Sequence, residues 1–180
     1  MIIIIGLPGS GKSFFAHKFS KIFKAPHIDY AFYRHRATNQ TAAGEIITDT
    51  TEKILLTKQT LLIEGTGHNK KTRSDLAQIA RKHSYKLLYV WVQTDTATAA
   101  QRAIKSKESP TTRYQFDQAA KNFQAPEKAT NYVVISGKHT YQTQAKSVLK
   151  KLVAERQPLT PEVTVEDPRR KAFFRNRIMG

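Results

Sequence analysis

The chain has 180 residues and no cysteine, which excludes a disulfide framework, a set of zinc-finger thiolates and a thiol nucleophile. Its hydrophobic fraction of 39% is enough for one domain with a sizeable core. The net charge is +16, from 30 Lys and Arg against 14 Asp and Glu, whereas a small domain typically carries ~2–8 units. We therefore expect a polyanionic partner, a nucleic acid or another polyanion, with a merely solubilising charge as the alternative.

No targeting, membrane or zinc-binding segment is predicted. The N-terminus has no basic region ahead of a long apolar stretch, as a secretory signal would have. No run of about 18 apolar residues occurs, so we expect no membrane partner. The six histidines show no metal-ligand spacing, so we expect no zinc. The sequence thus predicts a cytoplasmic protein.

The first predicted element is a buried β-branched strand over residues 2–5, and aromatic residues at helical spacing begin at residue 14. Between them, residues 6–13 (GLPGSGKS) fit the P-loop pattern of Gly, four residues, Gly-Lys and Ser or Thr. Glycines in such a loop let backbone N–H groups close around phosphate oxygens, Lys12 would neutralise the β- and γ-phosphates, and Ser13 would bind Mg²⁺. The pattern predicts ATP and Mg²⁺ as cofactors. The predicted nucleotide-binding residues are Gly6, Pro8, Gly9, Ser10, Gly11, Lys12 and Ser13.

Two further predicted strands each end in a carboxylate. Residues 25–29 end in Asp29, and residues 60–64 end in Glu64. In open α/β sheets, ligands bind beyond the carboxyl ends of the strands. Asp29 can therefore accept a proton from an attacking hydroxyl, or it can cap a helix or turn, and position alone leaves both open. Glu64 is typical of a Walker-B end, which holds Mg²⁺ through water or orients the nucleophile.

The stretch after Asp29 interleaves aromatic residues with cations, among them Arg34 and Arg36. This composition suits a nucleic-acid site in which bases stack on the aromatic rings and the cations contact the backbone. It suits equally well a lid helix that buries one aromatic face. Residues 38–44 are polar and small, which predicts a loop. A helix is predicted over residues 46–55.

The second half of the chain continues the alternation of predicted strands and helices. The elements predicted are a helix at 76–80, a strand at 86–92, and helices at 96–104 and 114–123, followed by a strand at 132–135 and a last helix at 140–155. A polar, basic stretch at 105–110 lies between the fourth and fifth strands. With Arg102, its Lys105 and Lys107 form a candidate lid that supplies cations to the transferring phosphoryl group, and a solvated surface loop is the alternative.

The sequence predicts a P-loop domain over residues 1–155 and a basic, proline-punctuated arm over residues 156–180. The arm could bind nucleic acid or an acidic partner, remain a solubilising tail, or dock on its own domain. Strands alternating with helices behind the P-loop predict an α/β fold with a doubly wound, five-stranded parallel sheet.

Over roughly residues 1–150 the chain resembles one branch of P-loop kinases, the polynucleotide 5′-hydroxyl kinases and related AAA-type small kinases, with zeta-toxin and chloramphenicol phosphotransferases as relatives. The matching positions are residues 6–13, Asp29, residues 62–66, Arg73 with Ala80, Arg102 and residues 123–127. The resemblance implies a kinase-like P-loop fold in which Asp29 is the general base. It also implies that Glu64 is the Walker-B carboxylate and that Arg102 is the first lid arginine.

Three departures from the family pattern concern the acceptor side. The family usually places an arginine three residues after the base, where this chain has Phe32, with Arg34 two residues later. Its Walker-B stretch usually reads Asp-x-Thr-Asn, where this chain has EGTG at residues 64–67. A second lid arginine is replaced by Ser106, and the flanking lysines supply charge without the bidentate fork of arginine. The residues predicted to bind substrate are Arg34, Arg36, Thr66, Arg73, Lys105 and Lys107.

These observations predict a Mg²⁺-ATP-dependent phosphotransferase whose catalytic groups are Lys12, Asp29 and Arg102. The preferred acceptor is a polynucleotide or nucleotide 5′-hydroxyl, because of the net charge and the aromatic-basic stretch. One alternative is a small-molecule kinase acting on a nucleoside, sugar or antibiotic. Another is a nucleotide-binding adaptor associated with RNA or a ribosome and without kinase activity.

Overall fold

The computed structural model describes residues 1–107 and 110–156. The strands are β1 (Ile2–Ile5), β2 (His27–Asp29), β3 (Leu62–Glu64), β4 (Leu88–Gln93) and β5 (Tyr132–Ser136). The helices are α1 (Lys12–Phe23), α2 (Tyr30–Arg36), α3 (Gln40–Leu56), α4 (Lys70–Lys82), α5 (Thr96–Ile104), α6 (Arg113–Asn122) and α7 (Tyr141–Arg156).

The five strands form one parallel sheet in the order β2-β3-β1-β4-β5, as predicted. Strand β1 is central because its four isoleucines are buried, which suits a strand covered on both faces. Asp29 pairs in register with Glu64, and Glu64 with Ile4. The two predicted carboxylates therefore lie level at the carboxyl end of the sheet, beside the loop that follows β1.

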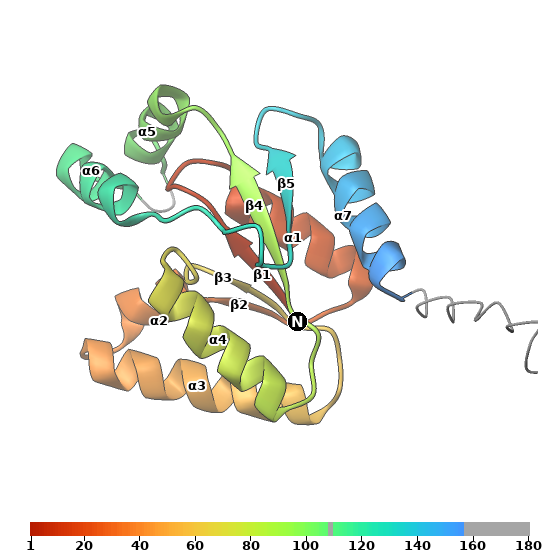
Figure 1. The fold of residues 1–180 in the computed structure, drawn as a ribbon. Helices are drawn as coiled ribbons and strands as arrows, with labels where there is room; N and C mark the ends of the chain where they lie inside the picture. The colour runs from red at the N-terminus through yellow and green to blue at the C-terminus, as the bar shows by residue number, and fades with distance from the viewer. Residues whose placement is uncertain (108–109, 157–180) are drawn as a thin grey trace, which may run out of the picture. The chain divides into compact units, whose positions relative to one another are not determined.

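Helices cover both faces of the sheet (Figure 1). Alternate residues of β1, Ile3 and Ile5, pack in one core with Leu55 of α3 and Leu76 of α4. The other face carries α1 and the beginning of α7, whose Tyr141 ring lies 6.0 Å from that of Phe15. The doubly wound arrangement follows from right-handed crossovers that run in opposite directions from β1.

Helices α5 and α6 pack on each other above the loop that follows β1. The small residues of α5, Ala99 and Ala103, are buried against Phe116 of α6, and Leu7 packs against this cluster. Helix α6 begins with a capping box between Thr112 and Gln115, which fixes its first turn. The pair of helices therefore forms one wall of the space beside the P-loop.

Most predicted helices are confirmed, and residues 96–104 match α5 end to end. The loop predicted over residues 38–44 is wrong, because α3 already begins at Gln40. The side chain of Asn39 accepts a hydrogen bond of 2.8 Å from the N–H of Ala42 and so caps this helix. No helix in the described part of the chain is long and apolar enough to cross a membrane.

The chain divides into a compact unit of Met1–Leu149 and a second unit from Lys150 onward. The first unit contains the whole sheet and helices α1 to α6. The predicted domain boundary at residue 155 stays a prediction. The predicted basic arm, beyond Arg156, lies outside the described residues.

Candidate active site

The P-loop backbone takes conformations that only glycine adopts readily. Gly9 has a φ of +73°, and a Cβ there would lie 2.1 Å from the carbonyl oxygen of Ala99, so the loop and α5 approach too closely for any side chain. Gly11 has a φ of +100°, but its nearest neighbour would be the Gly137 carbonyl oxygen at 4.0 Å. The space beside Gly11 is therefore open at the start of α1.

Helix α1 differs from the other helices of the sheet unit in how it begins. Helices α2 to α6 each have a side-chain cap at the N-terminus, whereas α1 starts after Gly11, which supplies none. The backbone N–H groups of its first turn thus lack the usual acceptor. A phosphate group would satisfy them, with the helix dipole favouring its negative charge. This arrangement fits the nucleotide that the P-loop pattern predicts.

Lys12 lies at the centre of the site. Its Nζ donates a hydrogen bond of 2.7 Å to the carbonyl oxygen of Leu7. Burial lowers the pKa of Lys12 to about 8, and the nearby carboxylates of Glu64 and Asp29 oppose this shift. A phosphate placed here would favour the ammonium form, as expected for a group that neutralises phosphate charge.

Ser13 and Glu64 form the pair expected of a Mg²⁺ site. The Ser13 hydroxyl donates a hydrogen bond of 2.7 Å to Oε2 of Glu64, which is 3% exposed. His27 Nε2 lies 3.0 Å from Oε1 of the same carboxylate. A hydroxyl and a carboxylate are oxygen ligands of the kind that Mg²⁺ prefers, with waters and phosphates supplying the rest. The donor set therefore fits the predicted metal.

Asp29 is the N-cap of α2. Its Oδ1 accepts a hydrogen bond of 2.8 Å from the N–H of Ala31. Gly65 packs closely against it, since a Cβ on Gly65 would lie 3.3 Å from Oδ1. The capping interpretation of Asp29 is confirmed, and its role as general base stays a prediction. The two roles are compatible, because a carboxylate has a second oxygen.

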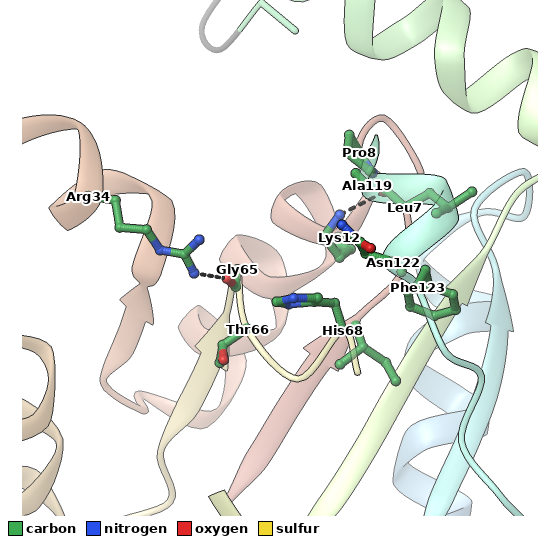
Figure 2. Close-up of a pocket in the computed structure, with 12 residues that line it drawn as sticks. Leu7, Pro8, Lys12, Arg34, Gly65, Thr66, His68, Ala119, Asn122 and Phe123 are labelled. Atoms are coloured by element: carbon green, nitrogen blue, oxygen red, sulfur yellow. Dashed lines mark hydrogen bonds between the residues drawn. The ribbon is translucent and has the colours of Figure 1, made fainter. Parts of the chain in front are cut away.

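A cavity of about 300 Å³ opens beside Lys12 (Figure 2). Arg34 and Thr66 line it opposite the P-loop, and Arg34 Nη2 donates a hydrogen bond of 2.5 Å to the carbonyl oxygen of Gly65. The structure thus brings together Gly6, Pro8, Lys12, Arg34 and Thr66 of the predicted site. It adds residues that the sequence analysis did not identify, which are Ile5, Leu7, Gly65, His68, Ala119, Asn122 and Phe123.

Five predicted cations do not line this cavity, and four of them, Arg73 being the exception, are exposed. Arg36 Nη1 bonds to the carbonyl oxygen of Phe32 at 3.4 Å, and its guanidinium lies 3.8 Å from the centre of the Phe32 ring. Arg102 Nη1 donates to the carbonyl oxygen of Gly137 at 3.2 Å. The other two, Lys105 and Lys107, are exposed beyond the end of α5.

Arg73 is buried beneath the site, at 6% exposure. Its Nη1 donates to the carbonyl oxygens of Gly67 at 3.2 Å and Gln124 at 2.7 Å, and its Nη2 donates to that of Ala125 at 3.3 Å. Burial lowers its pKa, although Tyr89 and Glu127 act in the opposite direction. Arg73 therefore joins the loop after β3 to the segment after α6, and it is not brought to the cavity where a substrate contact was predicted.

His68 is a site residue that the sequence analysis missed. It lines the cavity, and its Nε2 lies 3.3 Å from Nδ2 of Asn69. Burial lowers its pKa, and the positive charges of Arg34 and Arg73 lower it further. The only sequence signal was its place four residues after Glu64, because its spacing from the other histidines indicates nothing.

Comparison with known proteins places the chain among P-loop proteins. A family model described as an AAA domain matches residues 1–126. No curated protein matches the chain in sequence. Many solved structures are similar to this chain. The sequence identities of the three described next are at most 15%, so the likeness shows the fold alone.

Three of these solved structures illustrate the likeness. A gluconokinase from Sinorhizobium meliloti 1021 has a TM-score of 0.65 and 13% identity, over 86% of this chain and 91% of that one. A sugar kinase from Janibacter sp. HTCC2649 has a TM-score of 0.66 and 11% identity, over 84% and 93%. Chaetomium thermophilum Kti12 in complex with ADP-AlF3 has a TM-score of 0.62 and 15% identity, over 85% and 97%. The chain therefore has a kinase-like P-loop fold.

Proposed function

Because the chain belongs to the AAA domain family that its residues 1–126 match, we propose that it is a Mg²⁺-ATP-dependent phosphotransferase. It moves the γ-phosphoryl group of ATP to a hydroxyl, preferably the 5′-hydroxyl of a polynucleotide or nucleotide. The observation that carries this proposal is the hydrogen bond between Ser13 and the buried carboxylate of Glu64, beside Lys12 and next to a cavity that Arg34 and Thr66 line from the opposite side.

The nucleotide side of the site is supported by three features of the chain. The uncapped first turn of α1 offers N–H groups to phosphate oxygens. Lys12 would leave the Leu7 carbonyl to contact the β- and γ-phosphates. Ser13 and Glu64 would hold Mg²⁺, which neutralises charge on the phosphates when it is bound.

Asp29 is the proposed general base. It lies level with Glu64 at the carboxyl end of the sheet and is close enough to act on the charge of Lys12. With Oδ1 occupied by the cap of α2, Oδ2 would take the proton of the acceptor hydroxyl. Its place at the carboxyl end of the sheet, level with Glu64, favours a kinase over the alternative of a nucleotide-binding adaptor without activity.

The cations divide into three proposed groups. Arg34 would contact the acceptor directly, together with Thr66. Arg102, Lys105 and Lys107 lie on or just beyond α5. They form the proposed lid, which would have to move to bring their positive charge to the transferring phosphoryl group. The remaining two, Arg36 and Arg73, would support the acceptor side, and for Arg73 we propose a positioning role through the carbonyls it holds.

A small-molecule kinase is the second candidate. The cavity of about 300 Å³ lies at the lower end of the ~300–1,000 Å³ typical of ligand pockets, so a small acceptor would fit it. Two of the similar structures are a gluconokinase and a sugar kinase. The strongly basic chain favours an acceptor that carries phosphate over a neutral sugar.

A transfer assay with γ-labelled ATP across oligonucleotides, nucleosides and sugars tests the proposal. We expect label at the 5′ end of an oligonucleotide, and about 10²–10³-fold slower labelling with Lys12→Ala. Label on a sugar alone would select the small-molecule kinase. ATP binding with no transfer to any acceptor would select the adaptor and overturn the proposed function.

A further inference from the structure

A second groove lies beside the cavity, between the start of α4 and the end of α6. Its volume is about 910 Å³, and it is lined by Lys70, Lys71 and Lys121 together with polar residues. His68 and Asn122 line both this groove and the cavity beside Lys12. The two spaces therefore adjoin at these side chains, and we call the second one the lysine groove.

The charge of the lysine groove is positive. It contains three lysines and one carboxylate, that of Asp75, and all four residues are exposed. Lys70 pairs with Glu127, with 3.1 Å between Nζ and Oε1. Within residues 1–107 and 110–156, Lys71 and Lys121 make no ion pair or hydrogen bond through their side chains. Two ammonium groups are therefore available to an anionic ligand.

The frame that carries these lysines is fixed. Helix α4 begins with a capping box between Asn69 and Thr72. The backbone N–H of Lys70 donates to Oε1 of Gln124 at 2.8 Å, and the N–H of Gln124 donates to the carbonyl oxygen of His68 at 2.8 Å. These bonds join the start of α4 to the segment after α6, so the two sides of the groove keep their spacing without a ligand.

We propose that the lysine groove binds the backbone phosphates of a single-stranded nucleic acid whose 5′ end enters the cavity beside Lys12. This inference rests on the proposed function and specifies its acceptor. A positively charged groove that tracks a backbone is the usual device of single-strand binding. Lysines act as point charges without base readout, so the groove takes phosphates irrespective of sequence. The acceptor is thus a strand with phosphates beyond its first nucleotide.

The test replaces the two unpaired lysines together, as Lys71→Gln with Lys121→Gln. The matched control is Lys21→Gln with Lys146→Gln, because these lysines are also exposed but lie on α1 and α7, across the sheet from α4. Each protein is assayed for transfer to a nucleoside and to a single-stranded tetranucleotide. Binding of the same tetranucleotide is measured by fluorescence anisotropy over a series of salt concentrations.

The groove variant should raise KM for the tetranucleotide by about two- to thirty-fold, as expected for the loss of two exposed charge contacts. Its KM for the nucleoside and its kcat should not change. The log–log salt slope of tetranucleotide binding should become shallower by about 1.4, because each single-strand phosphate contact contributes roughly 0.7. The control variant should match the wild type in all of these measurements.

Tetranucleotide KM and salt slope that stay at wild-type values in the groove variant would overturn the inference, while transfer to the oligonucleotide would leave the proposed function standing. Equal losses in the control variant would also overturn it, because the effect would then be one of overall charge. If the wild type phosphorylates no acceptor, the proposed function fails. The salt slope of tetranucleotide binding, measured by anisotropy, then tests the groove independently. A slope that is shallower in the groove variant but not in the control variant supports binding of the strand in the groove.

Discussion

The two sides of the candidate site are built differently. On the nucleotide side, Lys12, Ser13 and Glu64 bond to each other or to the P-loop at 2.7 Å, and Glu64 is almost fully buried. On the acceptor side, Arg34 and Lys71 are exposed, and Lys71 has no partner in the described part of the chain. Buried groups act in a low dielectric and exposed groups are screened by water.

This difference predicts how each side responds to substitution. Changes on the nucleotide side should lower activity by orders of magnitude, because Lys12 and Glu64 are desolvated and hydrogen bonds hold all three groups in place. Changes on the acceptor side should be graded and sensitive to salt. Asp29 lies at the boundary, since it caps α2 on one side and comes near Lys12 on the other.

The largest effect is expected for Asp29→Asn. Transfer should fall by about 10²–10⁴-fold, because asparagine cannot take the proton. ATP affinity and melting temperature should be nearly unchanged, since asparagine caps a helix as well as aspartate. Asp29→Ala separates the roles, because it should lose the cap as well, at about 1 kcal/mol of stability. Calorimetry, melting and labelled transfer measure the three quantities, and retained turnover in Asp29→Asn would move the base to Glu64 or remove the need for one.

Lys12→Ala should come next, with a loss of about 10²–10³-fold in transfer and weaker binding of ATP. The physical reason is that a buried ammonium beside the phosphates would be replaced by a methyl group. Lys18→Ala is the control, because Lys18 lies 4.4 Å from the centre of the Phe14 ring on α1 and does not line the cavity. Equal ATP affinity of Lys12→Ala and wild type in calorimetry would contradict the proposed nucleotide side.

Arg73→Met should destabilise the protein by about 2–3 kcal/mol, because it leaves the carbonyls of Gly67, Gln124 and Ala125 without their donor. Urea unfolding measures this loss. Under conditions where the variant is folded, its KM for the acceptor should rise while its affinity for ATP stays close to that of the wild type. A variant with unchanged stability and a changed ATP affinity would place Arg73 on the nucleotide side.

The smallest effect is expected from His68. Its pKa is lowered in the folded protein, so the unfolded chain binds more protons between that value and the ordinary pKa of about 6.5. Stability should therefore fall as the pH drops from 7 through this window, and His68→Gln should respond less. Melting temperatures between pH 5 and 7.5 test this, and equal slopes for both proteins would show that another group is responsible. The effect is small because His68 is only partly buried.

Much of the nucleotide side was predictable because its signals are local. The P-loop is a contiguous stretch, and the strand endings of Asp29 and Glu64 follow from short buried runs. The start of α3 was not predictable from composition, because a single cap at Asn39 outweighed the polar and small residues around it.

The sequence by itself determined the parallel α/β fold, the P-loop and the presence of a carboxylate at two strand ends, because each depends on periodicity or on neighbouring residues. The tertiary structure alone decided which residues, distant in the sequence, line the same cavity. Arg34, His68 and Asn122 meet at one cavity because β2 and β3 lie beside β1 while α6 packs above the P-loop. It also turned Arg73 inward to backbone carbonyls, since a buried guanidinium must satisfy its donors and no local pattern shows which acceptors will be near.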